Sequence, residues 1–188
     1  NMASFNSGIS VSWTATMTRR LEKNNDSLVT ESITDDDISW LMATGTVGIL
    51  LSLIFGSKLC EHIGRKYTTI LTALMFISGW LMRLLADKLY IMQIAQIWCG
   101  IGDGIALLII PLYVTEMSSN SIRGQLGSLF MFGVKAGYLF AFVLSALLSY
   151  EVFTSCCLII PSIQLVGLLF VPEAPVYLVR NDRLDEAR

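Results

Sequence analysis

The sequence predicts an all-α membrane protein, and three observations lead to that fold class. Hydrophobic residues make up 54% of the 188 residues, and charged residues make up 15%, whereas a soluble domain carries about 25% charged residues. The mean hydropathy is +0.63. The charges are also confined to short stretches between long apolar ones. Inside a bilayer the backbone amides must bond within their own segment, so these apolar stretches are expected to be helices.

Two stretches are long enough to cross the hydrocarbon core, which needs about 20 apolar residues. Residues 38–58 contain no charged side chain before Lys58, and residues 152–172 contain none at all. Three further stretches are long enough, but each contains one ionisable residue: 67–86 with Arg83, 89–115 with Asp103, and 124–150 with Lys135. All five are expected to span the membrane.

The opening stretch, residues 1–18, is free of charge but rich in Ser, Thr and Asn. We expect it to be the outer part of a first helix whose start is missing, which brings the number of spanning helices to six. Residues 1–175 then form one six-helix bundle. Residues 176–188 are expected to begin an amphipathic helix on the cytosolic side.

The loop of residues 19–37 indicates how the chain is oriented. It is acidic, and it contains Asn25-Asp26-Ser27, a sequon for N-glycosylation. A sequon also arises by chance in polar loops, so glycosylation of Asn25 stays open. Lysines and arginines favour the opposite face by seven to five, in the direction of the positive-inside rule. The protein is therefore expected to be multi-pass, in the plasma membrane, with both ends cytosolic.

The sequence offers no arrangement typical of an enzyme or a metal protein. Cys60, Cys99, Cys156 and Cys157 lie in or beside apolar spans and lack zinc or disulfide spacing, so we expect them to be small packing residues. His62 has no nucleophile or second ligand near it in the sequence. No cofactor and no nucleic-acid partner are expected.

Acids and bases recur together in three stretches that the span order places on one face. The first contains Glu61, Arg65 and Lys66 in a short loop, Gly56 to Lys66; the second contains Glu116, Arg123 and Gly124; the third begins Pro172-Glu173. Ion pairs between such groups could hold one arrangement of the helices and break in another, as in a gate. Ordinary positive-inside anchoring explains the same residues, and both interpretations stay open.

These stretches resemble motifs of a known family. Gly56 to Lys66, with Gly64 near its end, is similar to the G-x-x-x-D/E-R-x-G-R-R/K loop of the major facilitator superfamily. Pro111-Leu112-Tyr113-Val114-Thr115-Glu116 with Arg123-Gly124, and Pro172-Glu173-Ala174-Pro175-Val176-Tyr177-Leu178, are similar to signatures of its sugar porter branch. The resemblance implies the N-terminal six-helix half of a transporter for a hexose or a disaccharide such as trehalose. Such a protein works by alternating access, in a lipid bilayer and with a C-terminal six-helix half.

Several residues depart from the family pattern. His62 and Val176 stand where the family has arginines, which implies a smaller cytosolic ion-pair network. Met131 stands where many glucose transporters of the family have a sugar-binding glutamine. Asn6 stands where proton-coupled relatives have an aspartate, and since an amide exchanges no proton, this favours facilitated diffusion. Asn6 as a packing residue between helices stays open, as does a proton-coupled symporter.

The ionisable residues within spans are expected to mark the substrate path. Asp103 and Lys135 are equally far from Ser119 in the turn between two spans, so they would lie at the same height and could form a pair. Alternatively, each faces a water-filled cavity by itself. Gly100, Gly102 and Gly104 would allow a neighbouring helix to come close, and Arg83 is expected to snorkel to the membrane surface. The polar and aromatic candidates for sugar contact are Asn6, Trp13, Trp98 and Gln164.

A second class of function is left open by the sequence. A six-helix membrane protein without a second half could associate with full-length relatives and transport nothing by itself. A channel is less expected, because no filter-like acidic segment is visible in the sequence.

Overall fold

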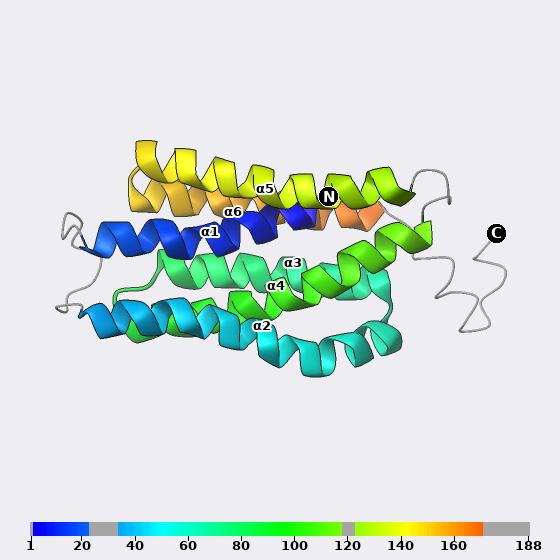
Figure 1. The fold of residues 1–188 in the computed structure, drawn as a ribbon, viewed down its shortest axis with the longest axis horizontal. Helices are drawn as coiled ribbons and strands as arrows, with labels where there is room; N and C mark the ends of the chain where they lie inside the picture. Colours follow the sequence, from blue (N-terminus) through cyan, green and yellow to red (C-terminus); the bar gives the residue numbers. More distant parts are fainter. Residues whose placement is uncertain (1, 23–33, 118–122, 171–188) are drawn as a thin grey trace.

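The computed structural model describes residues 2–22, 34–117 and 123–170, and within these ranges every regular element is a helix. The helices run alongside one another with alternating direction (Figure 1). All except α1 are long and apolar enough to cross a membrane. The predicted all-α membrane fold is confirmed. The bounds are α1 Met2–Glu22, α2 Asp35–Ile63, α3 Arg65–Leu84, α4 Leu89–Met117, α5 Arg123–Leu147 and α6 Tyr150–Phe170.

Helix α2 extends beyond the predicted apolar span at both of its ends. At its start the Thr34 hydroxyl accepts the Asp37 backbone N–H at 3.4 Å, and the Thr34 N–H donates to the Asp37 carboxylate at 3.0 Å. This reciprocal cap satisfies two backbone groups that would otherwise lack partners. The acidic run of residues 35–37 also lies where the helix dipole favours negative charge. Charged residues therefore mark the edge of the apolar span without ending the helix.

The predicted loop from Gly56 to Lys66 is wrong in its extent. Helix α2 continues to Ile63 and α3 begins at Arg65, so the turn consists of Gly64 alone. Gly64 has φ 98° and ψ 163°, which glycine adopts far more easily than other residues. Its N–H donates to the carbonyl of Cys60 at 3.2 Å. One glycine thus reverses the chain direction between two helices.

Glycines also determine which helices lie closest together. A Cβ atom on Gly100 of α4 would overlap the carbonyl oxygen of Gly45 on α2, and one on Gly104 would overlap the Ser52 hydroxyl. On the other side of the bundle, a Cβ on Gly137 of α5 would overlap the carbonyl of Phe5 on α1. The predicted close approach is confirmed for Gly100 and Gly104. Small residues allow two backbones to touch where lipid offers no hydrophobic driving force.

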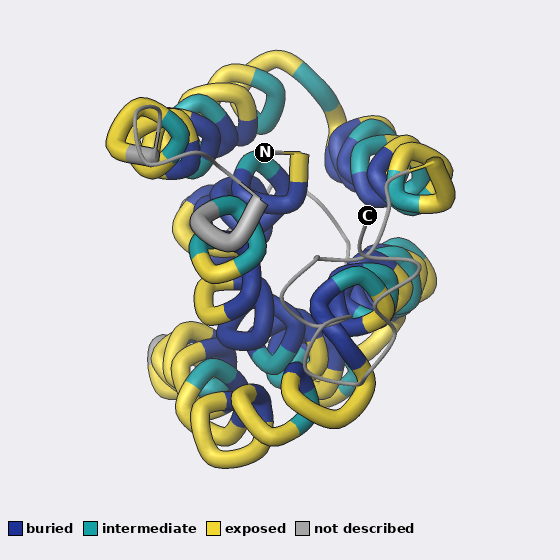
Figure 2. The backbone as a smooth tube through the Cα atoms, turned by 90° about the vertical axis from the view of Figure 1, so that its right-hand side faces the viewer, coloured by how far each residue is buried: buried dark blue, intermediate teal, exposed yellow. Residues whose placement is uncertain are grey.

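The main cluster of buried apolar side chains contains residues of all six helices. Figure 2 shows buried residues on the inner sides of the helices and exposed ones turned outward. The four cysteines are free thiols, three of them buried, as the packing interpretation predicts. The largest buried apolar side chains of this core include Trp13, Phe76, Trp80, Met92 and Phe153.

Candidate functional site

Helix α1 supplies more buried polar side chains than any other helix among the described residues. The Thr16 hydroxyl donates a hydrogen bond to the carbonyl of Trp13 at 2.9 Å, so some of the polar groups of α1 are satisfied within the helix itself. The polar composition of residues 1–18 thus reflects a helix enclosed by other helices. Its buried polar residues are Ser4, Asn6, Ser7, Ser10, Ser12, Thr14 and Thr16.

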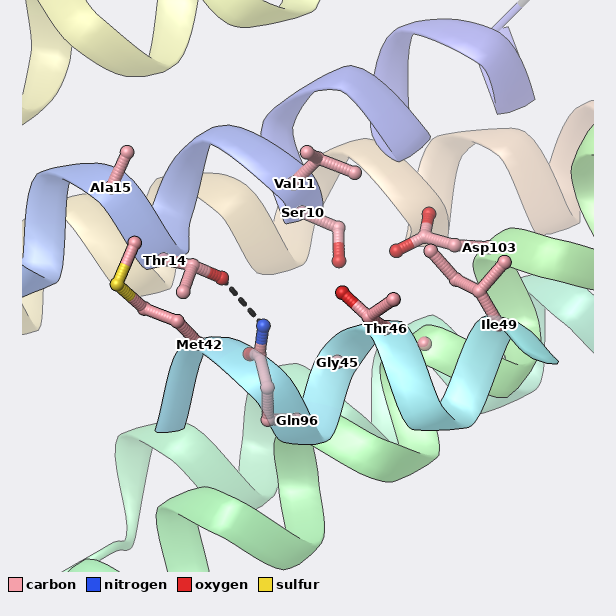
Figure 3. Close-up of a pocket in the computed structure, with 11 residues that line it drawn as sticks. Ser10, Val11, Thr14, Ala15, Met42, Gly45, Thr46, Ile49, Gln96 and Asp103 are labelled. Carbon is pink, nitrogen blue, oxygen red and sulfur yellow. Dashed lines mark hydrogen bonds between the residues drawn. The ribbon is translucent and has the colours of Figure 1, made fainter. Parts of the chain in front are cut away.

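A cavity of about 180 Å³ lies between α1, α2 and α4 (Figure 3). We call it the polar groove. The hydroxyls of Ser10 and Thr46 point toward each other in its middle, between Gln96 and Asp103. Six of the eleven lining residues are apolar or glycine, and the other five have polar side chains. The lining residues are Ser10, Val11, Thr14, Ala15, Met42, Gly45, Thr46, Ile49, Gln96, Gly100 and Asp103.

Arg83 is fully buried, so the prediction that it snorkels to the membrane surface is wrong. Its guanidinium carbon lies 4.2 Å from the ring centroid of Trp13 and 4.6 Å from that of Trp80. A cation over an indole face is attracted by the ring quadrupole, most strongly when both are removed from water. Two tryptophans on different helices therefore give Arg83 an interior site that no charge pattern in the sequence reveals.

A chain of hydrogen bonds leads from Arg83 to the polar groove. Nη2 of Arg83 donates to Oε1 of Gln96 at 2.6 Å, and Nε2 of Gln96 donates to the Thr14 hydroxyl (Figure 3). A guanidinium has donors and no acceptor, so it fixes which end of the Gln96 amide faces it. The Tyr150 hydroxyl donates to the Arg83 carbonyl at 2.7 Å, which attaches the end of α3 to α6.

Asp103 lies at the other end of the groove and is 3% exposed. The hydroxyls of Ser7 and Ser10 on α1 hydrogen-bond to its carboxylate, and the charge of Arg83 acts on it favourably. Its Oδ1 atom has no hydrogen-bond partner among the described residues. A buried carboxylate oxygen without a partner is costly, which makes it a candidate acceptor for a ligand.

The predicted pair between Asp103 and Lys135 is not formed. Asp103 turns toward α1, whereas Lys135 is exposed on α5 with Nζ 5.1 Å from the ring centroid of Tyr138. The side chains of Asp103 and Lys135, both among the described residues, form no ion pair with each other. Equal height along two helices leaves the rotation of each helix undetermined, and the rotation separates these side chains. Asp103 lines the polar groove, and the alternative, in which each residue faces a water-filled cavity by itself, stays a prediction.

The other predicted path residues belong to four different helices. Asn6 is fully buried, and both polar atoms of its side chain lack partners among the described residues. Gln164, 4% exposed, lines a second cavity of about 310 Å³ between α1, α3, α4 and α6. Met131 is 61% exposed on α5. Trp98, 42% exposed, donates from Nε1 to the Ser78 hydroxyl at 2.9 Å.

The structure describes the first charged stretch and part of the second. The turn between α2 and α3 lies at the same end of the bundle as the facing ends of α4 and α5 (Figure 1). Beside this turn Glu61 is exposed and Arg65 is buried, and a nitrogen of the Arg65 guanidinium donates to the Cys60 carbonyl at 3.5 Å. Lys66 is half-buried. The gating ion pairs therefore stay a prediction, because several predicted groups lie outside the described part: Asn25, Pro172, Glu173 and the side chains of Glu116 and Arg123.

Sequence reasoning missed Gln96 and Thr46, which line the groove. One signal was available for Gln96, because it precedes Asp103 by seven residues, close to two helical turns, and so shares its face. No comparable signal pointed to Thr46, which belongs to another helix. Within the described residues no group of His, Cys, Asp and Glu could hold a metal ion.

The family model described as "Sugar (and other) transporter" matches residues 2–188. The chain is 30% identical over 188 residues to the facilitated trehalose transporter Tret1 of Apis mellifera ligustica, covering all of this chain and 37% of the relative. It is 30% identical over 153 residues to a Bos taurus protein, solute carrier family 2, facilitated glucose transporter member 8. That match covers 81% of the chain and 32% of the relative.

Solved structures show the same fold at lower identity. A partially occluded inward-open structure of the xylose transporter XylE from E. coli matches with a TM-score of 0.82 and 18% identity, over 99% of this chain and 52% of that one. The proton:xylose symporter XylE bound to 6-bromo-6-deoxy-D-glucose matches with a TM-score of 0.77 and 20% identity, over 99% of this chain and 46% of that one. The chain thus spans about half the length of these transporters and about a third of the length of the two relatives from Apis mellifera ligustica and Bos taurus.

Proposed function

The chain belongs to the sugar transporter family of the major facilitator superfamily, and from this premise we propose that it is the N-terminal half of a sugar carrier that works by alternating access. The observation that carries the proposal is the polar groove, which brings hydroxyls, an amide and a carboxylate together inside the bundle. Asp103 lies in the middle of α4, far from both helix ends. Polar groups at that depth in a membrane protein commonly mark the path of a substrate.

We propose a neutral sugar, a hexose or a disaccharide such as trehalose, as the substrate. The names of the relatives support trehalose and glucose as the first compounds to test. Hydroxyl and amide groups recognise sugar hydroxyls because both partners can donate and accept. Facilitated diffusion is the proposed mode, since the buried residue at position 6 is an amide that takes up no proton.

The exposed apolar faces of α2 and α5 support a second six-helix half as the partner. Large apolar side chains are exposed along α5, and 17% of its most apolar stretch is buried, against 50% for α3 and α4. In the proposed transporter these faces meet the other half or the lipid bilayer. The exposed residues of α5 include Leu129, Met131, Phe132, Leu139, Phe142 and Val143.

The proposed orientation has the α2–α3 turn and the facing ends of α4 and α5 in the cytosol of a cell with this carrier in its plasma membrane. Acid and base at these positions, Glu61 with Arg65 and Lys66 and Glu116 with Arg123, would lock one arrangement of the two halves. The loop of residues 19–37 would then lie outside, where Asn25 would be available for glycosylation.

The test is uptake of labelled trehalose and glucose by proteoliposomes that contain the protein encoded by the complete transcript. We expect saturable uptake that stops when the internal and external concentrations are equal, with or without a proton gradient. Accumulation above equilibrium that requires the gradient would instead show a symporter. Uptake of neither sugar, together with association with a full-length relative, would favour the non-transporting partner.

A further inference from the structure

The two ends of the polar groove have opposite hydrogen-bonding character. At one end Gln96 turns its carbonyl oxygen toward Arg83, so its amide nitrogen must face the groove. That nitrogen carries two hydrogens, and one of them goes to Thr14. At the other end the Asp103 carboxylate can only accept when it is ionised, and its Oδ1 lacks a partner among the described residues.

The space in front of the Gln96 amide is kept open by Gly45. A Cβ atom at this position would lie 2.7 Å from Nε2 of Gln96, closer than real Cβ atoms approach a neighbour. Gly45 itself lines the groove on the α2 side. The second hydrogen of the Gln96 amide can therefore reach a ligand. A larger residue in place of Gly45 would cover that amide nitrogen.

Between the two ends lie two hydroxyls: that of Ser10 hydrogen-bonds to Asp103, and that of Thr46 can donate or accept. Ser10 on α1 and Thr46 on α2 face each other there (Figure 3), and Thr46 is exposed. Gln96 and Asp103 are separated by seven residues, which corresponds to about 10 Å along the helix axis. A ligand that satisfies both ends must present an acceptor to the Gln96 amide and a donor to Asp103, and must carry no negative charge near Asp103, because a second anion would repel that carboxylate. Hydroxyl groups meet both needs, since each can donate and accept.

We propose that the polar groove is a subsite of the transported sugar, in which the Asp103 carboxylate accepts a hydrogen bond from one sugar hydroxyl and the Gln96 amide donates to a second. Arg83 is the positioning residue that holds Gln96 in this orientation. The proposal rests on the proposed function, sugar transport, and adds which helix of this half binds the sugar. It assigns to α4 a role in binding as well as in packing.

The test is the binding of glucose and trehalose to the full-length protein in detergent, measured by isothermal titration calorimetry for the wild type and for Asp103→Asn. Because a hydrogen bond to a charged group is among the stronger ones, we expect binding to weaken at least tenfold in Asp103→Asn. Asp87→Asn is the matched control, since Asp87 is exposed between α3 and α4. It should bind like the wild type.

A series of singly deoxygenated glucoses identifies the contact itself. The sugar that lacks the contacted hydroxyl should bind more weakly than glucose to the wild type and no more weakly than glucose to Asp103→Asn. If Asp103→Asn does not fold, Thr46→Val replaces it, because this residue is exposed and its substitution conserves shape. Thr46→Val should weaken binding several-fold.

Two results would overturn the subsite, and they differ from failure of the function. Sugar binding that is the same in the wild type, Asp103→Asn and Thr46→Val would remove the groove from the sugar site and leave the transport proposal standing. Proton release on sugar binding that is lost in Asp103→Asn, with unchanged affinity, would make Asp103 a proton site instead. Absence of sugar binding in the wild type would end both proposals.

Discussion

Nη2 of Arg83 lies 2.6 Å from Oε1 of Gln96, and this bond joins a fully buried cation on α3 to an amide on α4. Two other nitrogens of the same guanidinium, Nε and Nη1, have no hydrogen-bond partner among the described residues. The faces of Trp13 and Trp80 provide the remaining electrostatic support. The bond to Gln96 is therefore central both to the stability of Arg83 and to the shape of the groove.

Removal of the Gln96 amide should destabilise the bundle, because the buried charge of Arg83 then loses its hydrogen-bond partner. Gln96→Leu leaves a further guanidinium donor buried without a partner, which costs about 1.5–3 kcal/mol. In the double variant Gln96→Leu with Arg83→Met, the charge is absent as well, so we expect part of this stability to return. Thermal unfolding in detergent measures both the loss of stability in Gln96→Leu and its partial return in the double variant. A double variant that is as unstable as the sum of the two single variants would contradict the coupling.

Glycine at position 100 should be essential for the packing of α2 on α4. The Cβ of Gly100→Ala would overlap the carbonyl oxygen of Gly45, and overpacking of this kind costs about 1–3 kcal/mol. Gly127→Ala in α5 is the control, because nothing lies within 4 Å of the position of its new Cβ. The control should be neutral or slightly stabilising, since alanine is the better helix former. Equal unfolding temperatures for the two variants would contradict the packing.

Gly64 should tolerate no side chain, because of its backbone conformation. With φ 98° and ψ 163° it occupies a region used almost only by glycine, and strain of this kind costs about 1–3 kcal/mol in other residues. Gly64→Ala is therefore expected to unfold at lower temperature than Gly124→Ala, whose new Cβ meets open space. If Gly64→Ala unfolds at the wild-type temperature, the turn between α2 and α3 is not confined to one residue.

Lys135 should be reached by water although it lies in the middle of α5. It is exposed, and an ammonium group at this depth is expected to face an aqueous path. Lys135→Cys should react with a membrane-impermeant thiol reagent in the full-length protein, whereas Ile163→Cys on the exposed apolar face of α6 should not. Three of the four native cysteines are buried, which keeps the background low. Equal protection of both variants would place Lys135 against lipid or protein.

The sequence was sufficient for the number and order of the helices, because apolar length between charged stretches is a direct consequence of bilayer thickness. It was insufficient for the helix ends and the turns, since residues such as Lys58 and Glu61 are charged and yet continue α2. The sequence also did not determine the rotation of each helix about its own axis. Arg83 turned inward, where its guanidinium lies over Trp13 of α1, and no spacing along α3 specifies a partner on another helix. Lys135 turned outward, with its ammonium near the ring of Tyr138 on its own helix.

The central claim is that sugar occupies the polar groove between α1, α2 and α4. The most direct measurement is the rate at which Thr46→Cys reacts with an impermeant thiol reagent, in the presence and absence of glucose or trehalose, in the full-length protein. Thr46 is exposed at the groove, so we expect rapid reaction that slows when the sugar is bound. A reaction rate that saturating sugar leaves unchanged, in a protein that still takes up that sugar, would contradict the claim.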